Sequence, residues 1–187
     1  MAGLEDSYIR NIDKTDTTPP IDDIGMRAED LVIDFFNENF PGQFTVRHAT
    51  PEEDSGVKQI EQGKQIDAVV YDEKGAPVMC IQISTARNKE VRREKVMQLM
   101  SRPFIRLTEM RAQDPAIPKV LVNIDPIEAS TVLIDHDFSK HPKISEQIIR
   151  SSIESLGFVL TKTQLKDEQD RVRTLISILE KGKGGTH

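Results

Sequence analysis

The feature of this sequence that most constrains its fold is a pair of β-rich runs separated by a short polar turn. Residues 65–71 and 78–84 are dominated by apolar and β-branched side chains, and residues 72–77 between them include a glycine and a proline. Two such runs around a turn are typical of a β-hairpin. A tight reversal of the chain in this turn places Asp67 of the first run directly opposite Gln82 of the second.

Polar side chains interrupt these runs at Asp67, Gln82 and Ser84. Strand alternation puts Gln82 and Ser84 on one face, opposite to Ile81 and Ile83. A buried carboxylate is costly unless it is paired or ligated. Directly opposed side chains of an antiparallel pair have Cβ atoms about 4.5–5.5 Å apart, so one hard cation can contact both oxygens. Asp67 and Gln82 therefore form either a metal site or a structural hydrogen bond, and a register slip of one residue would separate them.

The rest of the hydrophobic pattern predicts an α/β fold. Besides the hairpin, the pattern predicts a helix over 26–40, a strand over 44–48, a helix over 88–101 and a buried strand over 118–124. The core order is then αβββαβ, a mixed central sheet flanked by helices. Further helices are expected over 144–156, ended by Gly157, and over 166–181, whereas residues 127–138 fit a helix or a strand.

Composition divides the chain into four parts. They are a flexible acidic N-terminal arm (1–23), the αβββαβ core (24–125), a C-terminal helical extension (126–181) and a flexible tail (182–187). The chain of 187 residues has a net charge of −6, yet residues 87–106 hold seven basic and two acidic side chains. The basic element is thus concentrated on the helix that follows the hairpin.

The composition also excludes several classes of protein. A single cysteine, Cys80, leaves no internal disulfide and no multi-cysteine zinc site, and its apolar neighbours predict a buried thiol. His136 and His141 do not have same-face helical spacing, so they are expected at the surface and not as ligands. No apolar run approaches the roughly 20 residues of a membrane span, and no signal peptide is recognisable, so a cytoplasmic location is expected.

The element order and the polar positions resemble the PD-(D/E)xK nuclease superfamily, which includes restriction endonucleases and Holliday-junction resolvases. The resemblance covers residues 24–125, with Glu29 on the first helix, Asp67 on a strand and Gln82 on the second arm of the hairpin. It implies a restriction-endonuclease-like fold in which Asp67, Gln82 and Glu29 hold Mg²⁺. Ser84 stands where the family has its catalytic lysine. Lys89 or Lys64 would then supply the amine.

Three functions follow from these patterns. The leading one is a metal-dependent nuclease that hydrolyses phosphodiesters of nucleic acid, with DNA favoured as the substrate. The basic residues that would hold the phosphates are Arg87, Lys89, Arg92, Arg93 and Lys95. The alternative is a degenerate member that lost the lysine and serves as a non-catalytic nucleic-acid-binding or protein-binding module. The third is an interaction domain that forms a homodimer through a helical seam of Val172, Leu175, Ile176 and Leu179.

Each assignment has a structural alternative. An acidic residue in the first turn of a helix, such as Glu29, commonly favours the helix dipole and faces water. Charge-rich helix faces are usually solvated, and Glu90 and Glu94 can pair with Arg93 or Lys95 along the same helix. The acidic loop that contains Glu53 is likewise expected to be solvated.

Overall fold

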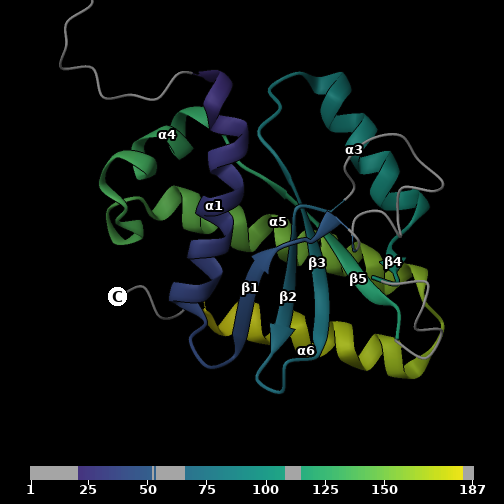
Figure 1. Cartoon of the computed structure of the whole chain (residues 1–187). Coiled ribbons are helices and arrows are strands. Elements are labelled where there is room, and N and C mark those ends of the chain that lie inside the picture. Colours follow the sequence, from purple (N-terminus) through teal and green to yellow (C-terminus); the bar gives the residue numbers. More distant parts are fainter. Residues whose placement is uncertain (1–20, 52, 54–65, 108–114, 183–187) are drawn as a thin grey trace, which may run out of the picture.

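A computed structural model describes residues 21–51, 53, 66–107 and 115–182, which form a five-stranded mixed sheet with helices packed against it (Figure 1). The strand order is β1-β2-β3-β5-β4, and only the β3–β5 pair is parallel. The strands are β1 (Phe44–His48), β2 (Ala68–Asp72), β3 (Pro77–Ser84), β4 (Phe104–Ile105) and β5 (Ile117–Asn123). The helices are α1 (Ile21–Asn39), α3 (Lys89–Ser101), α4 (Pro126–Asp135), η1 (Phe138–Lys140), α5 (Pro142–Lys162) and α6 (Lys166–Gly182).

The predicted α/β class and the mixed sheet flanked by helices are confirmed. The strand over 44–48 has the predicted bounds, and α3 begins one residue late because Asn88 is its N-cap, accepting a hydrogen bond from the Glu90 N–H. The ambiguous segment 127–138 is mainly the helix α4. Asp125 caps it, and Pro126 occupies its first position.

Two predicted helix boundaries were wrong, and one short strand was missed. The helix α1 begins at Ile21, inside the range assigned to the acidic arm, while residues 1–20 and the tail 183–187 lie outside the described residues. Gly157 does not end α5, which continues to Lys162, because a glycine inside a helix costs only about 1 kcal/mol and Leu156 and Val159 are buried on either side of it. The short strand β4 carried no recognisable signal in the sequence.

The main hydrophobic core covers one face of the sheet. Alternate residues of β3, Met79, Ile81 and Ile83, join the same cluster as Phe35 and Phe36 of α1. Buried side chains of α4, α5 and α6 belong to this cluster too. The predicted dimer seam was wrong in its location, because Val172, Leu175 and Leu179 of α6 are buried in this core and Ile176 packs against it.

The opposite face of the sheet carries a smaller cluster and the polar positions. Val69 and Cys80 lie there with Ile66, Ile105, Leu107 and Ile117. The prediction of a buried Cys80 is confirmed, and burial raises the pKa of its thiol to about 12. Because Cys80 lies on this face, strand alternation places Gln82 and Ser84 there too, as predicted.

The far half of β5 is covered by a helix and not by another strand. Ser155 of α5 accepts a hydrogen bond from the Leu121 N–H at 3.0 Å and donates one to the Leu121 carbonyl at 3.1 Å. One turn earlier, Ser151 makes the same two contacts with Asn123, each at 3.4 Å. The spacing of four residues on the helix matches two residues on the strand, so α5 runs beside the open edge of β5.

In the part of the chain that the structure describes, no helix combines the length and the apolar character needed to cross a bilayer.

Candidate functional site

Asp67 lies immediately before β2, next to the end of β3. The pairs Ala68–Ile81, Val69–Cys80 and Val70–Met79 have the predicted register, although it shifts between Val70 and Tyr71 and so differs nearer the turn. The Asp67 N–H donates to the Ile81 carbonyl at 2.8 Å. Its carboxylate, in a residue only 8% exposed, accepts the Ile83 N–H at 2.6 Å. The side chain of Asp67 therefore supplies the hydrogen-bond partner for Ile83 that β2, which begins only at Ala68, does not supply.

Gln82 and Ser84 are more deeply buried than Asp67. Gln82 is 3% exposed, and its Oε1 atom has no hydrogen-bond partner among the residues that the structure describes. Ser84 is 2% exposed, and its hydroxyl accepts the Ala86 N–H at 3.3 Å. A buried acceptor without a partner costs about 1–3 kcal/mol, so a water or another donor bound at the Gln82 oxygen would stabilise the fold.

A lysine amine reaches the same end of β3, and it belongs to Lys95. The Lys95 Nζ atom donates to the Ile83 carbonyl at 3.2 Å. The N–H and C=O of one strand residue point to the same edge, so the Lys95 amine and the Asp67 carboxylate bind neighbouring groups of Ile83 on one side of β3. Lys89 is exposed at the start of α3, and Lys64 lies outside the described residues.

Glu29 lies on the other side of the sheet from the predicted site. Its carboxylate is 3.5 Å from His48 Nδ1, and the neighbouring Asp30 contacts His48 Nε2 at 2.6 Å. His48 pairs with Ala68, which is part of the main core, so strand alternation directs the His48 side chain toward α1. Gln82 points to the opposite face. The contacts of Glu29 thus tie it to His48.

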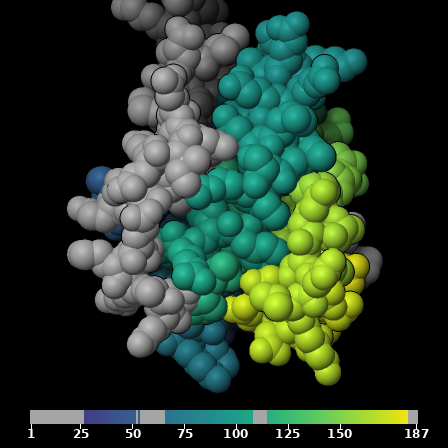
Figure 2. Space-filling model, turned by 90° about the vertical axis from the view of Figure 1, so that its right-hand side faces the viewer, coloured from purple at the N-terminus to yellow at the C-terminus, as the bar shows by residue number. Residues whose placement is uncertain are grey.

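The basic residues of α3 lie on a surface that packs little against the sheet. Leu99 is the buried residue of α3, whereas Val96, Met97 and Met100 are exposed. Figure 2 shows this teal segment at the surface. Arg92 donates to the Ala86 carbonyl, and Arg87 lies 3.7 Å from Asp125. The side chains of Arg92 and Arg93 belong to exposed residues.

The donor set fits a hard cation only partly. Within the described residues, no group of three or more His, Cys, Asp and Glu side chains could hold a metal ion. Asp67 supplies one carboxylate, and the unpartnered Gln82 oxygen is of the kind that Mg²⁺ and Ca²⁺ accept. Any cation here would therefore be held by an amide oxygen as well as by a carboxylate.

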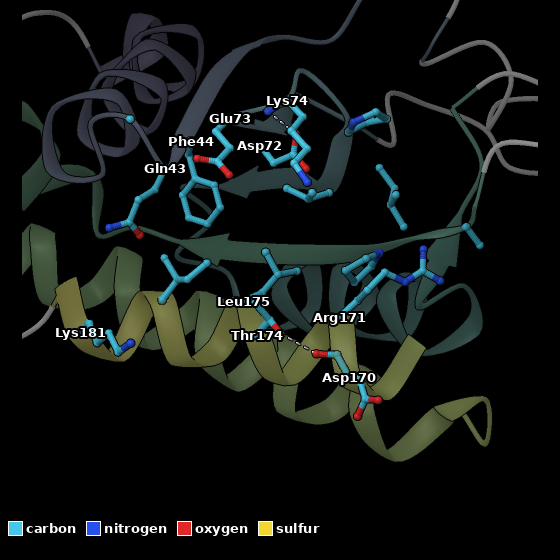
Figure 3. Close-up of a pocket in the computed structure, with 17 residues that line it drawn as sticks. Gln43, Phe44, Asp72, Glu73, Lys74, Asp170, Arg171, Thr174, Leu175 and Lys181 are labelled. Carbon is cyan, nitrogen blue, oxygen red and sulfur yellow. Dashed lines mark hydrogen bonds between the residues drawn. The ribbon is translucent and has the colours of Figure 1, made fainter. Parts of the chain in front are cut away.

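A large cavity lies at the other end of the sheet. It has a volume of about 670 Å³ and lies between the β2–β3 turn and α6, with Phe44, Lys74 and Glu73 on one side and Arg171 and Leu175 on the other (Figure 3). Its lining includes the first residues of β3 and β5. Among the described residues, none of those predicted for the site lines this cavity.

Sequence reasoning missed a polar cluster on the outer strands. Arg47 of β1 forms two hydrogen bonds with Glu53, at 2.7 and 3.0 Å, and also contacts the Tyr71 hydroxyl. Tyr71 donates to Glu53 at 3.0 Å. Glu53 is therefore buried and paired, contrary to the expected solvated loop. Arg47 is exposed on β1 and Tyr71 is half-buried on β2, and neither strand's local pattern reveals that the two side chains meet.

The histidines do not extend the candidate site. His136 is exposed and has a positive φ of 52°, and it follows α4. His141 contacts Asp135 at 2.9 Å, and this hydrogen bond lowers the pKa of the Asp135 carboxyl. This contact joins the end of α4 to the start of α5.

Comparison of the chain with protein-family models, with curated proteins and with solved structures gave no match.

Proposed function

We propose that this chain is a nuclease-like protein with a restriction-endonuclease-like core, which binds nucleic acid through α3 and hydrolyses phosphodiesters beside Asp67. One observation carries this proposal. The Asp67 carboxylate and the Lys95 amine bind the N–H and the C=O of Ile83, and the preceding residue of β3, Gln82, has a buried oxygen without a partner among the described residues. A carboxylate, an amine and an amide oxygen at one strand end are the groups that metal-assisted phosphodiester hydrolysis needs.

Each side chain has a defined role in this proposal. Asp67 and Gln82 would hold the cation, which when bound supplies positive charge to the phosphate and lowers the pKa of a bound water. Lys95 supplies the positive charge that Ser84 cannot, next to the position where a scissile phosphate would develop negative charge. Arg92 and Arg93 would hold flanking phosphates from the exposed side of α3.

Glu29 was expected to be a third metal ligand. Its contact with His48 and its place on the α1 side support a structural role instead. We therefore keep Asp67, Gln82 and Lys95 as the proposed reacting groups and assign no step to Glu29. Lys89 remains a candidate for phosphate binding at the start of α3.

The proposal is tested by cleavage of labelled DNA and RNA in Mg²⁺ or Mn²⁺. Asp67→Asn keeps an oxygen that can accept the Ile83 N–H but removes the charge, so we expect cleavage to fall below detection. Lys95→Met should lower kcat by about 10²–10³, the usual effect of removing one electrostatic donor. Lys89→Met is the matched control, because this lysine is exposed on the same helix, and it should change KM and leave kcat unchanged.

Two results would contradict the proposal. If cleavage persists in Asp67→Asn, the reacting centre does not lie at this end of β3. Loss of kcat in Lys89→Met but not in Lys95→Met would show that the amine comes from the start of the helix.

The second candidate is a non-catalytic binding module. The hydrogen bond that the Asp67 carboxylate already makes within the protein favours this function. This carboxylate accepts a backbone N–H, and the contact gives Asp67 a structural role at the strand end. Binding of nucleic acid by the wild-type protein with no turnover in either metal would support this function over the enzyme.

A further inference from the structure

The large cavity between the β2–β3 turn and α6 takes no part in the proposed function, because it lies at the opposite end of the sheet from Asp67. Its volume of about 670 Å³ falls within the range of roughly 300–1,000 Å³ that is usual for small-molecule sites. A cavity of this size, separate from the proposed reacting groups, is a candidate site for a second ligand.

The middle of the cavity is apolar. Phe44 of β1 and Val78 of β3 line it on the side of the sheet, and Leu175 and Ile178 line it on the side of α6. Leu175 and Ile178 are three residues apart and therefore share one face of the helix. Figure 3 shows Phe44 and Leu175 both pointing into the cavity. An apolar ligand would cover this surface and remove it from water.

The α6 wall is long and carries a cation at each end of the apolar stretch. Arg171 and Lys181 both line the cavity and are ten residues apart, about 15 Å along the helix axis. Gly182 packs against the Phe40 ring just before β1, so the Lys181 end of α6 lies beside β1. The helix crosses the end of the sheet from there, and the Arg171 end lies toward β5 (Figure 1).

Two acidic residues of the lining are engaged in local contacts. The Oδ1 atom of Asp72 accepts the N–H groups of Lys74 and Ala76, each at 2.9 Å, within the turn. Asp170 lies 3.3 Å from Arg173, and Figure 3 shows its carboxylate directed away from the cavity. Among the described residues, neither carboxylate forms an ion pair with a cation of the lining.

The Arg171 end of the cavity is suited to an anionic group. The Nε atom of Arg171 donates to the Asp167 carbonyl at 3.3 Å, and its two Nη groups have no partner among the described residues. The acidic Glu73 directly follows β2, the neighbour of β1, and so lies toward the Lys181 end. The fork of Nη groups matches the oxygens of a carboxylate or a phosphate.

We propose that this cavity binds an elongated amphipathic anion. Its anionic head contacts Arg171, and its apolar chain lies between α6 and the walls formed by β1 and β3. Lys74 and Lys181 line the same space and add to its attraction for an anion. The inference goes beyond the proposed function and does not require that the protein cleaves nucleic acid.

The test measures the binding of four probes to the full chain by isothermal titration calorimetry, each below the concentration at which it forms micelles. Decanoate and decyl phosphate carry the chain and an anionic head, 1-decanol carries the chain without charge, and acetate carries the head without the chain. We expect the two long anions to bind, decanol to bind more weakly and acetate not to bind. Their affinity should fall with added salt, since Arg171 is exposed. The tighter of the two anions identifies the head group.

Variants at Arg171 test the anionic head. Arg171→Met removes the charge and should lower the affinity for the long anions about fivefold, as expected for an ion contact exposed to solvent, and leave that for decanol unchanged. Arg173→Met is the matched control, because it removes the same charge from the same helix outside the lining of the cavity, and it should leave the affinity for the anions unchanged.

Variants at Thr174 test the apolar space. Thr174→Trp fills the cavity from an exposed position of α6 and should abolish the binding of both long anions and of decanol. Ser177→Trp adds the same side chain at an exposed position of α6 outside the lining and should keep their binding. Circular dichroism checks that both variants are folded.

The outcomes separate this inference from the proposed function. A wild type that binds neither long anion overturns the inference, and so does binding that persists in Thr174→Trp. Equal losses in Arg171→Met and Arg173→Met, or decanol bound as tightly as the long anions, overturn the anionic head at Arg171. Binding that is lost in Thr174→Trp and kept in Ser177→Trp, in a protein that cleaves neither DNA nor RNA, upholds the inference while the proposed hydrolysis fails.

Discussion

At the scale of single residues, the cluster of Arg47, Glu53 and Tyr71 is the clearest coupling of charge and burial. Burial opposes the charged form of Glu53, yet hydrogen bonds from Arg47, from the Thr50 N–H and from Tyr71 together lower the pKa of its carboxyl. Burial and the hydrogen bond to Glu53 raise the pKa of Tyr71 to about 12. The cluster therefore favours a charged glutamate and a neutral tyrosine at neutral pH.

The Tyr71 phenol should titrate well above a free tyrosine. In a Tyr8→Phe background, which leaves Tyr71 as the sole tyrosine, absorbance at the phenolate band should give a midpoint near 12. Glu53→Gln should move this midpoint toward 10, because the negative charge that opposes ionisation is gone. A midpoint unchanged by Glu53→Gln would contradict the contact.

The pKa shifts of Glu53 and Tyr71 both stabilise the fold, but their contributions are lost at opposite ends of the pH range. Since the pKa of Glu53 is lower in the folded state, its contribution is present above the unfolded pKa and is lost as pH falls through the folded value. Since the pKa of Tyr71 is higher in the folded state, its contribution is present below the unfolded pKa and is lost as pH rises through about 12. Denaturant titrations of wild type and Glu53→Gln should therefore converge at acid pH.

At the scale of elements, the contact between α5 and β5 replaces a strand pairing. Ser155 satisfies both backbone groups of Leu121, and all of these atoms are buried. A serine on a helix is usually interpreted as neutral or mildly unfavourable, and nothing in the local sequence shows that it faces the edge of a sheet. The sequence therefore predicted the helix but not its function as the border of the sheet.

Removing the Ser155 hydroxyl should lower the stability of the protein, because this hydroxyl pairs with the edge of β5. Ser155→Ala leaves a buried N–H and a buried C=O without partners, so we expect a loss of about 1–3 kcal/mol in the free energy of unfolding. Ser151→Ala is the graded comparison, because its contacts are longer, at 3.4 Å, and its site is only partly buried. Denaturant unfolding measures both, and an equal or larger loss in Ser151→Ala would contradict this account.

The candidate site was only partly predictable, because some of its contacts join elements whose relative positions the local sequence does not show. The alternation of β3 placed Gln82 and Ser84 on one face, and this followed from local periodicity alone. Asp67 was expected to face Gln82, but its carboxylate binds the Ile83 N–H, because β2 begins one residue later and leaves that group without a strand partner. The contact of Lys95 with Ile83 depends on the path from β3 into α3, which hydrophobic periodicity does not encode.

At the scale of the whole molecule, charge is separated between the acidic body and the basic α3 segment. The net charge is −6, whereas residues 87–106 carry seven basic and two acidic residues. An anionic partner would therefore approach productively from the side of α3. The exposed Val96, Met97 and Met100 on the same helix add apolar surface next to these charges.

Neutralising α3 should weaken the binding of nucleic acid in a salt-dependent manner. For Arg92→Ala with Arg93→Ala we expect a lower affinity and a plot of log affinity against log salt that is less steep by about 1–2. Arg150→Ala with Arg173→Ala removes two exposed arginines from α5 and α6 and is the matched control. Fluorescence anisotropy across a salt series measures both, and equal losses in the two double variants would show attraction by overall charge only.

The contacts of the α5 serines with β5 also affect how readily this protein would aggregate. An unsatisfied strand edge is a template on which chains of neighbouring molecules assemble into fibrils. Here an invading chain would first have to peel away a helix whose other side is embedded in the main core. Fibril growth from this border therefore requires that α5 first detach from the core, so stabilising the interior should also suppress aggregation that starts there.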